Sequence, residues 1–113
     1  MPHVILEHTD NITAQVKASS VLKRLHSAVV GSGLFSPDAV KTRRVSYDEV
    51  CWGEAGMPVE FAHVTVKILA GRTTEQKEAL ADTVFAVLMA ALPDVPKLSV
   101  DIHDMVKETY RKT

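Results

Sequence analysis

The second residue of the chain is a proline that follows the initiator methionine, and it is the residue best suited to unusual chemistry. Aminopeptidases generally remove a methionine that precedes a small residue, and its removal would leave Pro2 with a free secondary amine. An α-amino group titrates at about pH 8 in model peptides, and a general base works best when its pKa lies near the working pH. We therefore predict that Pro2 is a catalytic base.

Apolar surroundings and nearby cations both lower the pKa of an amine. The strand residues Val4, Ile5 and Leu6 offer the apolar surroundings. The cations that could gather beside the amine are Lys41, Arg43, Arg44, Lys67 and Arg72. Proline also occurs at position 2 by chance, so a Pro2 without a chemical role stays open as an alternative.

The spacing of apolar residues predicts the elements that must hold these side chains. Residues 2–8 form a short run of β-formers, which indicates a mostly buried strand. Residues 16–30 carry apolar positions three and four apart, which predicts one amphipathic helix ended by Gly31-Ser32-Gly33. Residues 39–47 are expected to form a second strand.

The same order then occurs again. We expect a loop at 53–58, a strand at 59–69, a helix that stops before Pro93 and a last strand at 98–103. Thr73 and Gln76 match the capping box, in which each side chain satisfies a backbone amide at the start of the helix.

The two halves look like copies of one β-α-β unit, about 1–57 and 58–113, because His3-Val4 and His63-Val64 begin strands 60 residues apart. Strands linked through a helix pair in parallel with a right-handed crossover. We predict one α+β domain with a four-stranded sheet and two helices on one face. The other face is expected to be apolar and to be covered by self-association.

Composition narrows the class of protein. The chain has 113 residues, 46% of them hydrophobic, which excludes disorder, and its net charge of −1 gives no field that would attract nucleic acid. The single cysteine, Cys51, excludes an internal disulfide framework and suggests the cytoplasm. The longest apolar run, 84–92, is far shorter than the roughly 20 residues of a membrane span. The five histidines lack the spacing of metal ligands, so no metal is expected.

The sequence also resembles a known family. Residues 68–80 (ILAGRTTEQKEAL) closely resemble the opening of the 4-oxalocrotonate tautomerases, where a strand, a Gly-Arg turn and a helix follow an N-terminal proline. Residues 2–12 (PHVILEHTDNI), 33–35 (GLF) and 63–72 (HVTVKILAGR) resemble the 5-carboxymethyl-2-hydroxymuconate isomerase family. That family is a fused, double-length branch of the tautomerase superfamily, which also includes macrophage migration inhibitory factor.

The resemblance implies a fold of two β-α-β repeats, a homotrimer and no cofactor. It implies that the proline amine moves a proton between carbons of an unsaturated 2-hydroxy or 2-oxo dicarboxylate, such as 5-carboxymethyl-2-hydroxymuconate in aromatic catabolism. Within the repeat, Ala62 occupies the position of Pro2, and Ile12 occupies that of Arg72. Each half thus lacks what the other supplies, as expected if one proline-arginine site remains where there were two.

The same resemblance assigns roles to the cations. Arg72 matches the turn arginine of the family, whose planar fork suits a substrate carboxylate. Lys41 stands where the family has a second arginine, and Arg43, two residues later on the same strand face, is the alternative, slightly preferred. Arg44 points the other way and is expected to be solvated. Trp52 is a possible pocket wall, although a tryptophan of the core or of a subunit interface is the preferred interpretation.

Two other functions stay open. The same amine could serve hydration, dehalogenation or decarboxylation of a small unsaturated acid, or the chain could be a non-catalytic α+β oligomer that binds a small ligand. Residues 107–112 are expected to form a solvated tail or an arm that reaches a neighbouring subunit.

Overall fold

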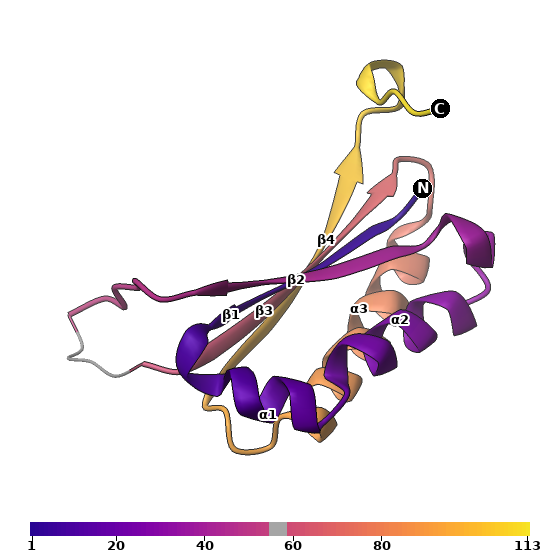
Figure 1. Ribbon diagram of the computed structural model, residues 1–113. Coiled ribbons are helices and arrows are strands. Elements are labelled where there is room, and N and C mark those ends of the chain that lie inside the picture. Colours follow the sequence, from indigo (N-terminus) through magenta and orange to yellow (C-terminus); the bar gives the residue numbers. More distant parts are fainter. Residues whose placement is uncertain (55–58) are drawn as a thin grey trace.

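The computed structural model describes residues 1–54 and 59–113 (Figure 1). The strands are β1 (His3–Thr9), β2 (Lys41–Tyr47), β3 (Phe61–Leu69) and β4 (Lys97–Met105). The α-helices are α1 (Thr13–Ala18), α2 (Val21–Gly31) and α3 (Thr74–Ala91). Three short 3-10 helices, η1 (Asp10–Ile12), η2 (Pro37–Ala39) and η3 (Lys107–Thr109), complete the elements of the described residues.

The described strands form one mixed sheet in the order β2-β1-β3-β4. β1 pairs in parallel with β2, and β3 pairs in parallel with β4, as the two predicted β-α-β units require. The units meet through the antiparallel pair β1–β3, in which His3 lies opposite Lys67 and His63 lies opposite Glu7. The two pairs correspond under the 60-residue spacing of the predicted repeat, since His63 lies 60 residues after His3, and Lys67 lies 60 residues after Glu7. The predicted α+β fold is confirmed.

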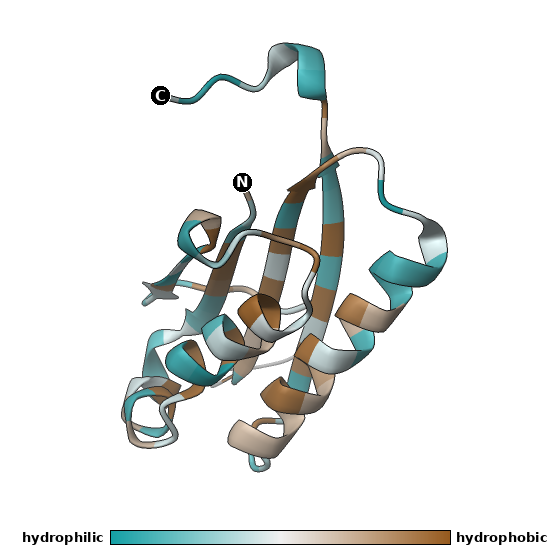
Figure 2. Ribbon diagram, turned by 90° about the vertical axis from the view of Figure 1, so that its right-hand side faces the viewer, coloured by the Kyte–Doolittle hydropathy of each residue, from teal (hydrophilic) through white to brown (hydrophobic). Residues whose placement is uncertain are grey.

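The helices pack on one face of the sheet and bury its apolar positions (Figure 1). Val4 and Leu6 of β1 and Val64 and Val66 of β3 are fully buried, together with Leu25 of α2 and Leu88 of α3. Figure 2 shows hydrophobic residues on the inner sides of the helices and hydrophilic ones toward their outer sides. Full burial of one such side chain contributes about 1.5–3 kcal/mol. This core fixes the strands and therefore the strand ends, where the candidate site residues lie.

The single helix predicted over 16–30 is wrong, because two helices occupy this stretch. Ser20 adopts the left-handed conformation (φ 55°, ψ 32°) between α1 and α2, and one such residue interrupts a right-handed helix. The apolar spacing is similar on both sides of the break, since Val16, Val21 and Leu25 all enter the core. Periodicity alone could not reveal the interruption.

The expectation of an apolar open face is also wrong. Side chains alternate between the faces of a strand, so the residues that do not face the helices include His3 and Glu7 of β1, Lys41 and Arg43 of β2, and His63 of β3. The short apolar run of β1 hid this alternation. Burial of an apolar sheet face therefore cannot be the force that drives self-association.

Smaller differences concern the element ends. β3 begins at Phe61 rather than Val59, β4 spans Lys97–Met105 rather than 98–103, and residues 55–58 of the predicted loop lie outside the described residues. The predicted capping box is confirmed, since the Gln76 amide donates to Thr73 Oγ1 (3.1 Å) and the Thr73 amide to Gln76 Oε1 (2.9 Å). Among the described helices, none has the length and apolarity needed to cross a membrane.

Candidate functional site

Four strand ends meet at one end of the sheet. Because β1 and β2 are parallel and β3 runs against β1, the starts of β1 and β2 lie beside the ends of β3 and β4. Figure 1 shows the N-terminus at this end, near the tips of β3 and β4, with the C-terminal segment above it. The topology therefore brings Pro2, Lys41 and the Arg72 turn together, although they are far apart in sequence.

Pro2 lies directly before β1 and is buried. A proline fits the start of a strand because it has no amide hydrogen to contribute to a sheet ladder. Its carbonyl accepts a hydrogen bond from the Lys41 amide (3.1 Å), which fastens the beginning of β1 to β2. The pKa of the amino group of Met1 is lowered, by burial first and then by the positive charges of Arg72, Lys41 and Lys112. The chain therefore starts in a partly dry, cationic neighbourhood.

Arg72 is held in place by the loop after α2. Its Nη2 donates to the Leu34 carbonyl (2.8 Å), its Nη1 donates to the Leu69 carbonyl (3.4 Å), and its guanidinium lies 4.8 Å from the centre of the Phe35 ring. Gly71 has a φ of 127°, a conformation that favours glycine, and it turns the chain from β3 toward Arg72. Held in this way, Arg72 loses little freedom when it binds an anion.

Lys41 and Arg43 lie on the open face of β2, opposite His3 and Ile5 of β1. Lys41 is close enough to the amino group of Met1 to lower its pKa, whereas Arg43 is not among the causes of that shift. Arg43 instead contacts His3, with 3.1 Å between Arg43 Nη1 and His3 Nδ1. The structure thus places the two alternative cations at different distances along β2, with Lys41 nearer to the amine.

His3 connects the site to the C-terminal segment. Its Nε2 lies 2.9 Å from the Tyr110 hydroxyl, and the two rings contact edge to face. The pKa of His3 is lowered, by burial first and then by Arg43, Lys41, the amino terminus and Lys67. A neutral His3 accepts from Arg43 at Nδ1 and donates to Tyr110 at Nε2.

Sequence reasoning missed the contribution of Tyr110; the rest of the segment 107–112 is exposed, as expected of a solvated tail. Tyr110 is half-buried against a residue 107 positions away, and Lys112 acts on the amino terminus. Nothing in the local sequence of this segment indicates the contact. Leu34 and Phe35, which hold Arg72, had a signal, since they belong to the GLF segment that carries part of the family resemblance.

Two of the predicted residues lie elsewhere. Trp52 is 40% exposed and contacts Phe61, at the start of β3 and so at the opposite end of the sheet from Leu69. It is neither a core residue nor a wall beside Pro2 within one chain. Arg44 is half-buried on the helix side of β2 rather than solvated, with its Nη1 3.2 Å from His8 Nε2.

The arrangement combines a base with fixed cations. An amine with a lowered pKa is more often neutral near pH 7 and can accept a proton. A guanidinium beside it suits a carboxylate, and a second cation can stabilise negative charge that develops in the reaction. The described residues contain no cluster of three or more His, Cys, Asp or Glu that could hold a metal ion.

Comparisons with known proteins agree with this geometry. The family model of 5-carboxymethyl-2-hydroxymuconate isomerase matches residues 2–112. The chain belongs to this family. The 5-carboxymethyl-2-hydroxymuconate Delta-isomerase of Escherichia coli is 27% identical over 90 residues, which cover 78% of this chain and 70% of that protein.

Solved structures give the same result. A 5-carboxymethyl-2-hydroxymuconate isomerase from Deinococcus radiodurans R1 superposes with a TM-score of 0.88 at 25% identity, over 99% of this chain and 88% of that one. The Q0 fused 4-OT, a wild-type symmetric trimer, superposes with a TM-score of 0.78 at 28% identity, over 98% of this chain and 91% of that one. The chain is therefore an isomerase with the tautomerase fold, and the alternative of a non-catalytic binding protein is set aside.

Proposed function

We propose that this isomerase uses the secondary amine of Pro2, freed by removal of Met1, as the base of a 1,3-proton shift. The substrate we propose is an unsaturated 2-hydroxy or 2-oxo dicarboxylate resembling 5-carboxymethyl-2-hydroxymuconate. The observation that carries this proposal is the position of Pro2, buried at the start of β1 and hydrogen-bonded to Lys41, where burial and then the charges of Arg72 and Lys41 lower the pKa of the adjoining Met1 amino group. The family membership of residues 2–112 supports the class of reaction.

The reaction needs only one acid–base group. Neutral Pro2 nitrogen takes the proton of the 2-hydroxy group, the oxygen electrons form the carbonyl at C2, and the electrons of the C2–C3 double bond move to C3. The protonated amine then returns the same proton to C3, the third atom of the O–C2–C3 unit, so that atoms and charge balance. The conjugated carbonyl already acidifies the substrate, and we propose that neither a metal nor a cofactor takes part.

The cations divide the remaining tasks. Arg72 binds a substrate carboxylate with its fork, since the Leu34 carbonyl and the Phe35 ring already fix its direction. Lys41 stabilises the dienolate, because it is the cation of β2 that acts on the amino terminus. Arg43 supports this charge from farther along the strand and is itself held by His3.

We also propose that the isomerase is a homotrimer. β2 and β4 each have one neighbour in the described sheet, and such edges pair readily with another chain. Val45 and Tyr47 of β2 are large hydrophobic residues that remain exposed, at 42% and 38%. Trp52 would line a pocket only if another subunit brought it to the site. A cytoplasmic location stays a prediction from the single cysteine.

The decisive experiment compares the wild-type protein with Pro2→Ala in an ultraviolet assay of 2-hydroxymuconate ketonisation. Both proteins are first examined by intact mass to establish that Met1 is absent. We expect the rate to fall by about 100-fold or more in Pro2→Ala, because a positioned general base contributes roughly 10²–10⁴-fold. Peptide mapping should find the proline-directed alkylator 3-bromopyruvate on the N-terminus of the wild type and not on that of Pro2→Ala, apart from labelling of the exposed Cys51 in both proteins.

Arg24→Gln serves as the matched control, since Arg24 is exposed on α2 and lies outside the candidate site. Its rate should equal that of the wild type. An unchanged rate in methionine-free Pro2→Ala would refute the proline mechanism, while leaving the family and the fold untouched.

A further inference from the structure

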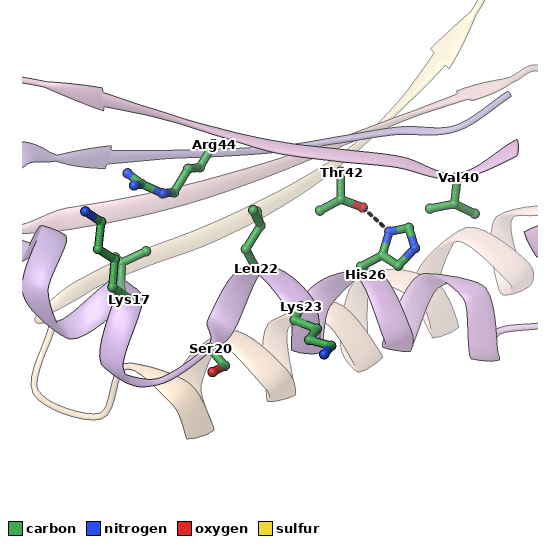
Figure 3. A pocket seen from close by; sticks show the side chains of 9 residues that line it. Lys17, Ser20, Leu22, Lys23, His26, Val40, Thr42 and Arg44 are labelled. Atoms are coloured by element: carbon green, nitrogen blue, oxygen red, sulfur yellow. Dashed lines mark hydrogen bonds between the residues drawn. The ribbon is translucent and has the colours of Figure 1, made fainter. Parts of the chain in front are cut away.

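A cavity lies between β2 and the helices α1 and α2, on the helix side of the sheet (Figure 3). Its volume is about 600 Å³, within the range of small-molecule sites. Its apolar lining comes from Val16, Leu22 and Val40, and Val16 and Val40 are buried. None of the candidate residues Pro2, Lys41, Arg43 and Arg72 lines it.

The charged residues of this cavity all have one sign. Lys17, Lys23 and Arg44 line it, and no aspartate or glutamate does. Figure 3 shows the charged ends of Lys17, from α1, and Arg44, from β2, directed toward the same end of the cavity. Over residues 1–54 and 59–113, neither residue forms a salt bridge. Two cations from opposite walls repel each other unless an anion lies between them.

Arg44 is oriented by a buried histidine. His8 is completely buried, and its Nδ1 lies 2.9 Å from the Thr9 carbonyl, which can only accept a hydrogen bond. The proton of His8 therefore sits on Nδ1, and its Nε2 accepts from Arg44 Nη1 at 3.2 Å. One N–H group of the guanidinium is fixed in this way, and its other donors remain for a ligand.

A second hydrogen bond lies at the other end of the cavity. His26 Nδ1 lies 2.6 Å from Thr42 Oγ1, which joins α2 to β2 (Figure 3). Leu22 extends into the space between this bridge and the cationic end. The cavity thus has a cationic end and an apolar body, both held by contacts within the chain.

We propose that this cavity binds a small amphipathic carboxylate as a second, non-catalytic ligand site. The carboxylate lies between Lys17 and Arg44, and its aromatic or aliphatic body contacts Val16, Leu22 and Val40. A neutral apolar molecule would leave the two cations facing each other, and inorganic phosphate would leave the apolar surface empty. This inference does not depend on the role of Pro2.

The test uses 2-naphthoate and its neutral analogue 2-naphthamide, titrated into the isotope-labelled protein and followed by amide chemical shifts. We expect saturable naphthoate shifts in α1, α2 and β2, around Lys17, Leu22 and Thr42. The affinity for naphthamide should be lower than that for naphthoate by about ten-fold or more, because naphthamide lacks the charge-assisted hydrogen bonds. Phosphate at the same concentration should cause no such shifts.

Substitution of single cations shows which of them binds the carboxylate of naphthoate. Lys17→Gln and Arg44→Gln should each weaken naphthoate binding by about ten-fold, while Arg24→Gln, which removes a neighbouring exposed cation of α2, should leave it unchanged. Lys17 is exposed, so its substitution does not endanger the fold. The proposal is overturned if naphthoate shifts only residues around Arg72, if naphthamide binds equally well, or if Arg24→Gln weakens binding as much as Lys17→Gln.

Discussion

The contacts of Arg72 explain how one residue can serve both the substrate and the base. Its guanidinium is fixed by the Leu34 carbonyl and the Phe35 ring, so it is in position before any substrate arrives. The same charge is the largest electrostatic cause of the lowered pKa of the amino terminus. Arg72 would therefore bind a carboxylate and also keep the Pro2 amine neutral.

Arg72→Gln should change the pH dependence of the reaction. The neutral amine is the active form, so kcat/KM rises as the pH passes its pKa. Removal of the positive charge raises that pKa and moves the rising limb to higher pH, although burial, the larger cause, keeps it below that of a free α-amino group. Loss of the charged hydrogen bonds should also raise KM by about ten-fold.

Measurement of kcat/KM from pH 5 to pH 9 checks this expectation, with Arg24→Gln as the charge-matched control. If the rising limb of Arg72→Gln coincided with that of the wild type, Arg72 would not act on the base. If the rising limb of Arg72→Gln moved to higher pH while its KM stayed unchanged, Arg72 would act on the base but would not bind the substrate carboxylate.

Individual residues differed in how far the sequence could predict them. Pro2 was predicted from the chemistry of its free amine, Arg72 and Lys41 from the family resemblance, and Arg43 because it lies two residues after Lys41 on the same strand face. The contact of His3 with Tyr110 was not predictable, since it joins residues 107 positions apart and neither has a local signature. A core position for Trp52 was wrong, since an exposed tryptophan and a buried one look alike in a sequence, while its place in a subunit interface stays a prediction.

Ser20, which interrupts the helix between α1 and α2, is the clearest site of strain in the described backbone. Ser20 has a φ of 55°, and it is the only non-glycine residue with positive φ among those described. A side chain in this conformation costs roughly 1–2 kcal/mol relative to the right-handed region. Ser19, its neighbour, has an ordinary helical conformation (φ −77°), and its hydroxyl donates to the Val16 carbonyl at 3.1 Å.

Ser20→Gly should therefore stabilise the protein by about 1 kcal/mol, because glycine adopts positive φ without the steric cost. Ser19→Gly should destabilise it by roughly 0.5–1 kcal/mol, since it adds freedom to the unfolded chain without relieving strain. Urea unfolding at one fixed protein concentration measures both changes. A lower stability of Ser20→Gly would contradict the strain at this position.

Helices and strands with distinct end signals were predicted best. α3 follows the capping box of Thr73 and Gln76 and stops shortly before Pro93, and both signals act locally. The break at Ser20 has no such signal, because the spacing of buried apolar residues is similar on both sides of it. The open face of the sheet was misjudged since a run of seven residues in β1 looked buried throughout, while only alternate side chains face the helices.

Among the described strands, β2 and β4 are the edges of the sheet, and its open face is rich in polar side chains such as His3, Arg43 and His63. Contact through the edges, rather than burial of an apolar face, is the basis that the sheet offers for a trimer. Exposed Val45 and Tyr47 would add hydrophobic contact along β2.

Sedimentation equilibrium should give a mass of three chains for the wild type and for Pro2→Ala, because the base does not hold subunits together. The same mass across a wide concentration range would indicate a stable assembly. A mass of one chain at concentrations where the enzyme is active would refute the trimer, and it would leave Trp52 without a site to line.

The hydrogen bond between His3 and Tyr110 shows that both ends of the chain converge on the same few side chains. Any sequence fused ahead of Pro2 would convert its nitrogen into an amide, which has no basicity to offer. A purification tag fused after Thr113 would directly follow the segment whose Tyr110 contacts His3, and so would lie near the same site.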